Sequence, residues 1–371
     1  MNRVYAMGGI GVGGHWYGRL HTFLREWIVL HRAAGLKTYP QREKLLSDYG
    51  VPSQRYHQVL PGQSLPDSFF DGIDVAYIAS HNQYHAAQVR QCVDHAKPVV
   101  VEKALATNET EFNQLLEYIR SKGLEHNVLV HLHYLDKAPT LELKNKLLPR
   151  LLAEQGRVTA AAATFLEAAS EEDSHRTWLL RPENGGITLD WTHAGAILTQ
   201  VVGARFDQCT SAQGYIVRPE YDQVHPTAVE AAYALSGDHL VPGAKAVVRV
   251  GKGFPEGSSF KGMRLQFESG ANLDLIYPGT HDEVRGSGGR WRVHKNGQTV
   301  QEGTPTPKPS YELFAQQMVG MLEGTQLPPS HAELEQIYRP VWLTHQKLAG
   351  QKPLTTGWNE LYARGEQLQI A

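Results

Sequence analysis

The stretch that decides the fold is VYAMGGIGVGG, residues 4–14. It begins as a short apolar run, becomes a row of glycines and is followed at once by a helical pattern over residues 15–25. The glycines satisfy the spacing G-x-G-x-x-G, in which glycine lets the backbone pass close to a pyrophosphate and the N–H groups of the next helix meet its charge. We therefore expect four residues of this turn to contact a dinucleotide: Gly9, Gly11, Val12 and Gly14.

Short apolar runs and helical patterns alternate over the first third of the chain. Further apolar runs occupy residues 27–30, 75–79, 99–101 and 128–132. These runs are continuous, as expected for strands buried on both faces of a parallel sheet, and their alternation with helices is typical of βαβ units. The sequence predicts a Rossmann NAD(P)-binding domain over residues 1–134.

A second domain of a different type is predicted over residues 135–371. Its strand-like runs lie at residues 158–165, 244–250, 263–268, 273–277 and 291–294. Several of them alternate apolar and polar residues, which indicates an antiparallel sheet with one covered face. The expected fold class is thus α/β plus α+β, with a C-terminal substrate-binding and oligomerisation domain built on a large, mostly antiparallel open sheet. A Pro- and Thr-rich linker at residues 303–309 leaves the C-terminal helices able to pack back on the first domain.

Composition excludes several classes of protein. A chain of 371 residues exceeds one core, since domains usually contain about 100–200 residues. Lys and Arg total 36 against 38 for Asp and Glu, a net charge of −2, so nothing favours nucleic acid or an anionic membrane as a partner. Cys92 and Cys209 form no C-x-x-C pair, and no apolar stretch approaches the ~18 residues of a membrane span. We expect a cytoplasmic protein.

The residues after the second apolar run bear on the choice of cofactor. An NAD site usually carries Asp or Glu about 20 residues after the glycine turn, where the carboxylate accepts the ribose hydroxyls. Here the run at 27–30 is followed by His31 and Arg32. Because arginine binds a 2′-phosphate that a carboxylate would repel, these two residues predict NADP, with NAD as the alternative.

Two runs, DVAYIASHNQYH at residues 74–85 and VVVEKALA at residues 99–106, carry a family resemblance. Their spacing resembles the glucose–fructose oxidoreductase, inositol dehydrogenase and rhizopine catabolism family, Gfo/Idh/MocA. The resemblance implies that the turn after the third run and the Glu-Lys pair border the cofactor. The residues concerned are Ser80, His81, Asn82, His85, Glu102 and Lys103.

Lys103 is the first catalytic candidate. It follows a buried apolar strand, and parallel strands present ligands at their carboxyl ends. The family places this lysine between nicotinamide and the reacting hydroxyl, where its ammonium favours the alkoxide-like charge of the transition state. Ala104 departs from the proline of the family. Since a non-proline cis peptide costs ~3 kcal/mol, that departure leaves the geometry of this turn open.

A second signature is GGITLDWTH at residues 185–193, which resembles the Gly-Gly turn and Asp-His pair of the family's second domain. Asp190 and His193, three residues apart, share a helix face. Histidine has a pKa suited to accepting a proton near neutrality, so His193 is the expected general base, with Asp190 orienting it or binding a neighbouring hydroxyl. The alternative is a helix cap and a half-buried histidine. Relatives more often have a spacing of four, which affects which of the two keeps the family role.

The run HYLDK at residues 133–137 follows the fifth apolar run. It partly resembles the substrate-binding run of glucose-6-phosphate dehydrogenase, although Leu132 and Ala138 replace acidic residues there. By this resemblance His133, Tyr134 and Lys137 hold a sugar phosphate; otherwise they donate hydrogen bonds to a neutral polyol, the reading we favour. Trp178 and Arg181 are candidates to cover the substrate, with surface packing as the alternative.

Other motifs are weaker. The pair His131 and His133 lacks the further ligands that a metal site needs, so no metal is expected. Ser258 and Lys261 fit S-x-x-K, which a Gly/Ser turn explains better.

The expected function is reversible hydride transfer between a nicotinamide and a secondary hydroxyl or ketone of a sugar, sugar phosphate or cyclitol, in a homodimer or homotetramer. The alternatives are a non-catalytic dinucleotide and sugar sensor, or a glycosidase that oxidises its sugar transiently.

Overall fold

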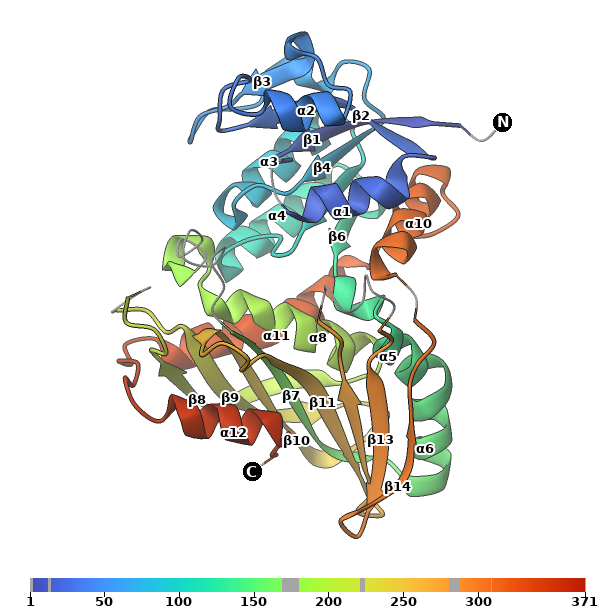
Figure 1. The fold of residues 1–371 in the computed structure, drawn as a ribbon, viewed down its shortest axis with the longest axis vertical. Helices are drawn as coiled ribbons and strands as arrows, with labels where there is room; N and C mark the ends of the chain where they lie inside the picture. Colours follow the sequence, from blue (N-terminus) through green and yellow to red (C-terminus); the bar gives the residue numbers. More distant parts are fainter. Residues whose placement is uncertain are drawn as a thin grey trace. The chain divides into compact units, whose positions relative to one another are not determined.

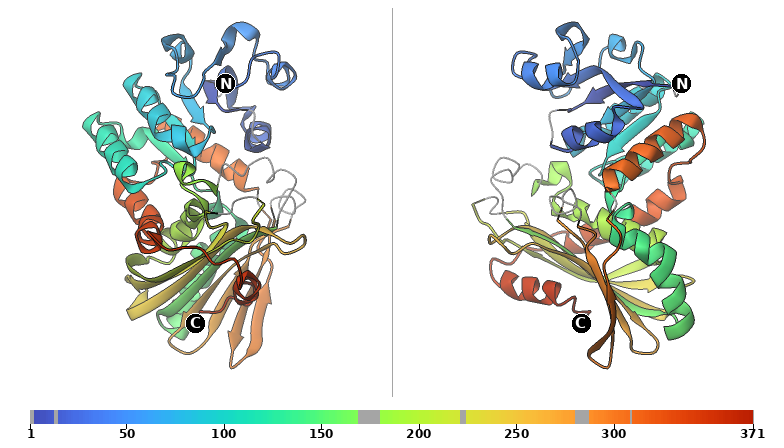
Figure 2. Two further views of the ribbon diagram at one scale, coloured as in Figure 1. Left: turned by 90° about the vertical axis from the view of Figure 1, so that its left-hand side faces the viewer. Right: turned by 45° about the vertical axis from the view of Figure 1, so that its right-hand side comes forward.

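The computed structural model describes residues 3–12, 15–168, 180–220, 224–279, 287–307 and 309–370 (Figures 1 and 2). The chain forms two compact units. Unit 1 contains residues 1–131 and 311–331, and unit 2 contains residues 132–310 and 332–371.

A six-stranded parallel sheet forms the centre of unit 1, with strand order β3-β2-β1-β4-β5-β6. The strands are β1 (Tyr5–Ile10), β2 (Ile28–Gly35), β3 (Tyr56–Gln58), β4 (Val75–Ile78), β5 (Val99–Glu102) and β6 (Val128–His131). The order reverses between β1 and β4, and such a switch point opens a ligand crevice at the carboxyl ends of the strands. The predicted Rossmann fold is confirmed.

Helices cover both faces of this sheet (Figure 1). They are α1 (His15–Leu24), α2 (Glu43–Asp48), α3 (Asn82–Asp94), α4 (Glu109–Ser121) and α10 (Ser310–Glu323). The last of these comes from far along the chain, yet Phe314 and Met318 pack into the same apolar cluster as Met7 and Tyr77. Helix α10 therefore completes the core on the face that α1 covers.

Unit 2 is built on an eight-stranded sheet of order β14-β13-β12-β11-β7-β10-β9-β8, in which only β7 and β10 pair in parallel. The strands are β7 (Val158–Ala168), β8 (Arg205–Tyr215), β9 (Ala228–Ser236), β10 (Leu240–Phe254), β11 (Phe260–Phe267), β12 (Asn272–Ile276), β13 (Arg290–Lys295) and β14 (Gln298–Gly303). The mostly antiparallel sheet is as predicted. The apolar runs did not indicate β8, β9 and β14; β8 and β14 are edge strands with many exposed side chains.

Helices α5 (Ala138–Glu142), α6 (Leu148–Gln155), α8 (Trp191–Gln200), α11 (His331–Leu348) and α12 (Trp358–Glu366) accompany this sheet. Helix α8 packs closely on α11, because a Cβ at Gly195 would lie 2.3 Å from the Ile337 carbonyl oxygen. Helix α12 covers one face of β7, where its Gly365 approaches Thr164 and Leu166. Since side chains alternate along a strand, Phe165 and Glu167 point to the opposite face of the sheet.

Among the described residues, every helix is too short or too polar to cross a membrane.

The contribution of α10 to unit 1 predicts the effect of one substitution. Phe314 is fully buried, so Phe314→Ala should lower the free energy of unfolding of unit 1 by about 3–5 kcal/mol in urea titrations. The control Gln316→Ala lies on an exposed position of the same helix and should change it by about 0.5 kcal/mol or less. Equal effects of the two variants would show that α10 is not part of this core.

Candidate active site

In the glycine turn at the end of β1, the backbone passes close to the backbone that follows β4. Gly11 has φ +73°, and its N–H donates to the Ala34 carbonyl oxygen at 2.9 Å. A Cβ at Gly11 would lie 2.6 Å from the Ser80 nitrogen, so only glycine lets this turn pass the end of β4. A Cβ at Gly9 would lie 2.2 Å from the Val12 side chain, which would have to move. Gly14 lies outside the described residues. A glycine turn before the N-terminus of α1 fits a dinucleotide pyrophosphate.

The second strand is longer than predicted, which moves His31 and Arg32. Strand β2 continues to Gly35, so both residues lie within the strand and not after it. The Arg32 Nε donates to the Asp71 carbonyl oxygen at 2.7 Å, and the Arg55 guanidinium lies 3.2 Å from His31 Nδ1. The prediction was wrong about the strand end, because the small buried residues Ala33 and Ala34 extend β2 beyond its bulky apolar run.

The residues that follow β2 are Leu36, Lys37 and Thr38. None of them is a carboxylate, and Lys37 is exposed. This edge of the sheet is therefore compatible with a 2′-phosphate, with Lys37 as the first cation after the strand.

The turn after β4 is tied to the turn after β5 by His85. The side chain of His85 is fully buried, with Nδ1 2.6 Å from the Ala104 carbonyl oxygen and Nε2 2.9 Å from that of Ser80. Burial lowers the pKa of His85, and these two contacts oppose the shift. His85 therefore links the turns that follow β4 and β5, and its contact with the cofactor stays a prediction. His81 and Asn82 lie half-buried at the start of α3, and the Ser80 hydroxyl donates to Gln88 at 2.6 Å.

Glu102 at the end of β5 is held by two donors. Its Oε1 accepts hydrogen bonds from the Tyr77 hydroxyl at 2.7 Å and from His131 Nδ1 at 2.8 Å. Burial alone would raise the pKa of Glu102, but these partners outweigh burial and lower it. Lys103 follows at the carboxyl edge of the sheet, half-buried, and its peptide bond to Ala104 is cis. The turn is therefore cis without the proline of the family.

In unit 2 the structure brings together aromatic side chains that are distant in sequence. The His193 ring centroid lies 4.8 Å from that of His133, 4.5 Å from Tyr134 and 5.8 Å from Phe165. His193 belongs to the first turn of α8, whereas His133 and Tyr134 begin a short 3₁₀ turn after β6. Burial raises the pKa of Tyr134 to about 12, so its hydroxyl remains a donor at neutral pH.

A group of four charges, the ion quartet, lies beside these rings and comprises Glu167, Asp190, Lys252 and Lys261. The Lys252 ammonium contacts a Glu167 carboxylate oxygen and lies 3.6 Å from Asp190 Oδ2. The Lys261 ammonium donates to the other Glu167 oxygen at 2.5 Å. Burial would raise the pKa of Glu167, but the two ammonium groups hold it well below its usual range.

Sequence reasoning missed Glu167 and Lys252 and attributed Lys261 to a turn. Lys261 in fact lies in β11. The alternation of side chains along a strand could have identified Lys261, because Lys261, Met263 and Leu265 lie on the same face of β11. Read by this alternation, Lys261 is an inward-facing lysine at the end of an apolar face.

The remaining predicted residues differ in exposure. Lys137 is only 2% exposed, with its ammonium 5.3 Å from the centre of the Tyr134 ring. Arg181 is exposed and lies 4.0 Å from Glu183, and Trp178 lies outside the described residues. Within the described part of the chain, no group of three or more His, Cys, Asp or Glu side chains is arranged to hold a metal ion.

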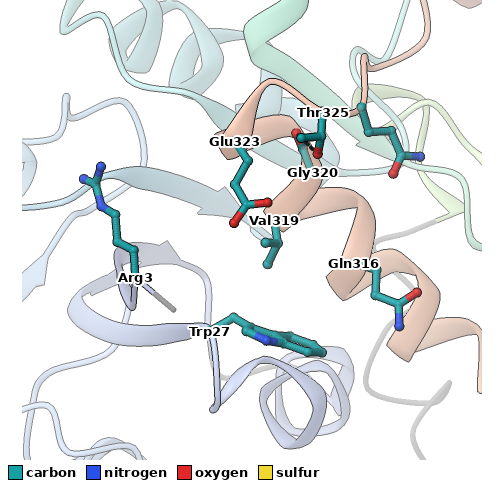
Figure 3. Close-up of a pocket in the computed structure, with 8 residues that line it drawn as sticks. Arg3, Trp27, Gln316, Val319, Gly320, Glu323 and Thr325 are labelled. Carbon is teal, nitrogen blue, oxygen red and sulfur yellow. Dashed lines mark hydrogen bonds between the residues drawn. The ribbon is translucent and has the colours of Figure 1, made fainter. Parts of the chain in front are cut away.

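One pocket of unit 1, of about 350 Å³, lies away from the glycine turn (Figure 3). Arg3 and Trp27 line it from the segments that precede β1 and β2, facing Gln316, Val319 and Glu323 of α10. It therefore lies at the amino ends of the strands, whereas dinucleotides bind at the carboxyl ends.

A glycine turn at the switch point of a parallel sheet, with a lysine at a neighbouring strand end, defines a dinucleotide-binding oxidoreductase. Residues 8–130 match the family model for Gfo/Idh/MocA, described as an oxidoreductase family with an NAD-binding Rossmann fold. Residues 8–130 therefore form a Rossmann domain of the NAD-binding type that this family model describes.

A characterised relative and solved structures resemble this chain in sequence or in fold. The chain is 25% identical over 263 residues, 69% of this chain and 71% of the relative, to the scyllo-inositol 2-dehydrogenase (NADP(+)) IolU of Bacillus subtilis (strain 168). The fold resembles aldose-aldose oxidoreductase from Caulobacter crescentus (14% identity, 94% and 99% of the two chains, TM-score 0.71). It also resembles an oxidoreductase from Agrobacterium radiobacter solved with NAD+, L-tartaric acid and magnesium (16% identity, 93% and 96%, TM-score 0.72).

The contacts of Glu102 predict a pH dependence of stability. Its folded pKa is lowered from about 4.5, so its ionised form stabilises unit 1 above that pH, and the contribution is lost as the pH falls through the folded pKa. Glu102→Gln should lower the free energy of unfolding by about 1–3 kcal/mol at pH 7, and the gap to the wild type should narrow below about pH 4.

The matched control is Glu117→Gln, which alters an exposed carboxylate of α4. Urea unfolding at several pH values measures both variants. A gap between Glu102→Gln and the wild type that is independent of pH would contradict the ionised, hydrogen-bonded state of Glu102.

Proposed function

We propose that the chain is an NADP-preferring dehydrogenase or reductase that interconverts a secondary hydroxyl and a ketone of a sugar or cyclitol. The position of Lys103 carries this proposal, because the residue follows β5 at the carboxyl edge of the sheet that holds the glycine turn. The relative named for scyllo-inositol and NADP(+) supports the substrate class and the cofactor.

The proposed roles follow from the chemistry of each group. The Lys103 ammonium donates to the reacting oxygen and stabilises the negative charge that develops there. His193 accepts the hydroxyl proton during oxidation and returns it during reduction. Asp190 orients His193 for this proton transfer. His133 and Tyr134 form hydrogen bonds with the substrate hydroxyls next to the reacting one. A nicotinamide bound at the glycine turn supplies or accepts the hydride.

Two substitutions test these roles. Lys103→Met and His193→Asn should each lower kcat/KM by about 10²–10⁴-fold while the Kd for NADP stays within about threefold of the wild type. The assay is a screen of sugars, sugar phosphates and inositols with NAD and NADP in parallel. Lys122→Met removes a surface lysine that follows α4 and serves as the control. Unchanged turnover in both variants would overturn the assignment.

The cofactor preference has its own test. We propose Lys37 as the cation for the 2′-phosphate, because it is the first charged residue after β2, whereas Arg32 is engaged with Asp71 within the strand. Lys37→Asp should lower kcat/KM for NADP by about 10–100-fold relative to NAD, since a charged hydrogen bond is replaced by repulsion. Arg32→Ala should change the ratio by about threefold or less. A larger change of the NADP/NAD ratio in Arg32→Ala than in Lys37→Asp would show that Arg32 binds the 2′-phosphate.

A further inference from the structure

The ion quartet is electrically balanced. Its two ammonium groups belong to Lys252 and Lys261, and its two carboxylates belong to Glu167 and Asp190. Glu167 is the common member, since each of its oxygens meets one lysine. It is also the most accessible of the four, with 33% of its side chain exposed against 16% for Asp190. A ligand that reaches this face of the sheet meets a carboxylate as well as an ammonium.

The cation expected to hold a phosphate is covered. Lys137 is 2% exposed, and its ammonium lies over the Tyr134 ring. The accessible lysines, Lys252 and Lys261, already neutralise Glu167. A phosphate dianion that binds here would lose part of its hydration shell and approach two carboxylates. It would find no ammonium group that is not already paired with a carboxylate, so its binding would be unfavourable.

We propose that Glu167 is a specificity-determining residue that selects an uncharged polyol over its phosphorylated form by occupying Lys252 and Lys261. The inference deepens the proposed function and rests on it for the location of the substrate. A hydroxyl both donates and accepts hydrogen bonds, so alternating carboxylates and ammonium groups suit a polyol. Among the described residues, Glu167 forms ion pairs with Lys252 of β10 and Lys261 of β11, and Lys252 also lies near Asp190 before α8.

Removing the charge of Glu167 should convert this face into an anion site. Glu167→Gln leaves two ammonium groups against one carboxylate, a net charge of +1. The probe is inorganic phosphate, titrated against chloride at constant ionic strength, with the thermal midpoint as readout and saturating NADP present so that the glycine turn is filled. We expect phosphate to raise the midpoint of the variant by about 2–4 °C more than that of the wild type.

Three further variants make the result specific. Glu167→Asp keeps the charge and should behave like the wild type, and the double variant Glu167→Gln/Lys252→Met should lose the extra stabilisation. Asp190→Asn also leaves a net charge of +1, so it should gain phosphate stabilisation even if Glu167→Gln does not fold. An equal phosphate response in the wild type and both neutralised variants would overturn the proposal.

Turnover by the holoenzyme gives a second readout. The wild type should oxidise a neutral inositol or sugar with kcat/KM at least about tenfold above that of its monophosphate, and Glu167→Gln should narrow this ratio by about tenfold. A wild type that prefers the phosphorylated compound would contradict the proposal. If no compound is oxidised at all, the proposed function fails, while the phosphate titration still decides the role of the charge balance.

Discussion

A carboxylate withdrawn from water needs hydrogen-bond donors or a counter-charge, and two such carboxylates organise the two units of this chain. In unit 1, Glu102 accepts from Tyr77 and His131, which fixes the end of β5 immediately before Lys103. In unit 2, Glu167 forms ion pairs with Lys252 and Lys261, and the Lys252 ammonium also lies near the Asp190 carboxylate. Both carboxylates are partly buried: Glu102 directly precedes Lys103, and Glu167 shares Lys252 with Asp190.

The patterns that the sequence predicts well are local ones. The glycine turn, the Glu-Lys pair and the Gly-Gly turn before His193 are each contained in about ten consecutive residues, and each lies at the end of a strand or the start of a helix as its local pattern indicates. Backbone chemistry explains this success, because a positive φ at Gly11 or a helix start at Trp191 depends mainly on neighbouring residues.

Features that depend on distant pairing were harder to predict. Strand β2 extends through Ala33 and Ala34 because β1 lies beside it, and no local apolar run marks that extension. The ion quartet joins residues from β7, β10 and β11 and the start of α8, so its members become neighbours only when the sheet forms. The docking of α10 in the core of unit 1 joins residues about 200 positions or more apart in sequence. Such contacts follow from topology, which single-sequence patterns describe weakly.

The fold is shared by proteins that act on different substrates, so substrate choice depends on the side chains that this fold carries. The central proposed step is hydride transfer from a substrate carbon to the nicotinamide. The most direct test is to incubate the protein with NADP+ and an inositol deuterated at its ring carbons, and to locate the deuterium by mass spectrometry and NMR. We predict net reduction, with deuterium on carbon 4 of the nicotinamide ring. No reduced cofactor, or deuterium lost to solvent, would contradict the account.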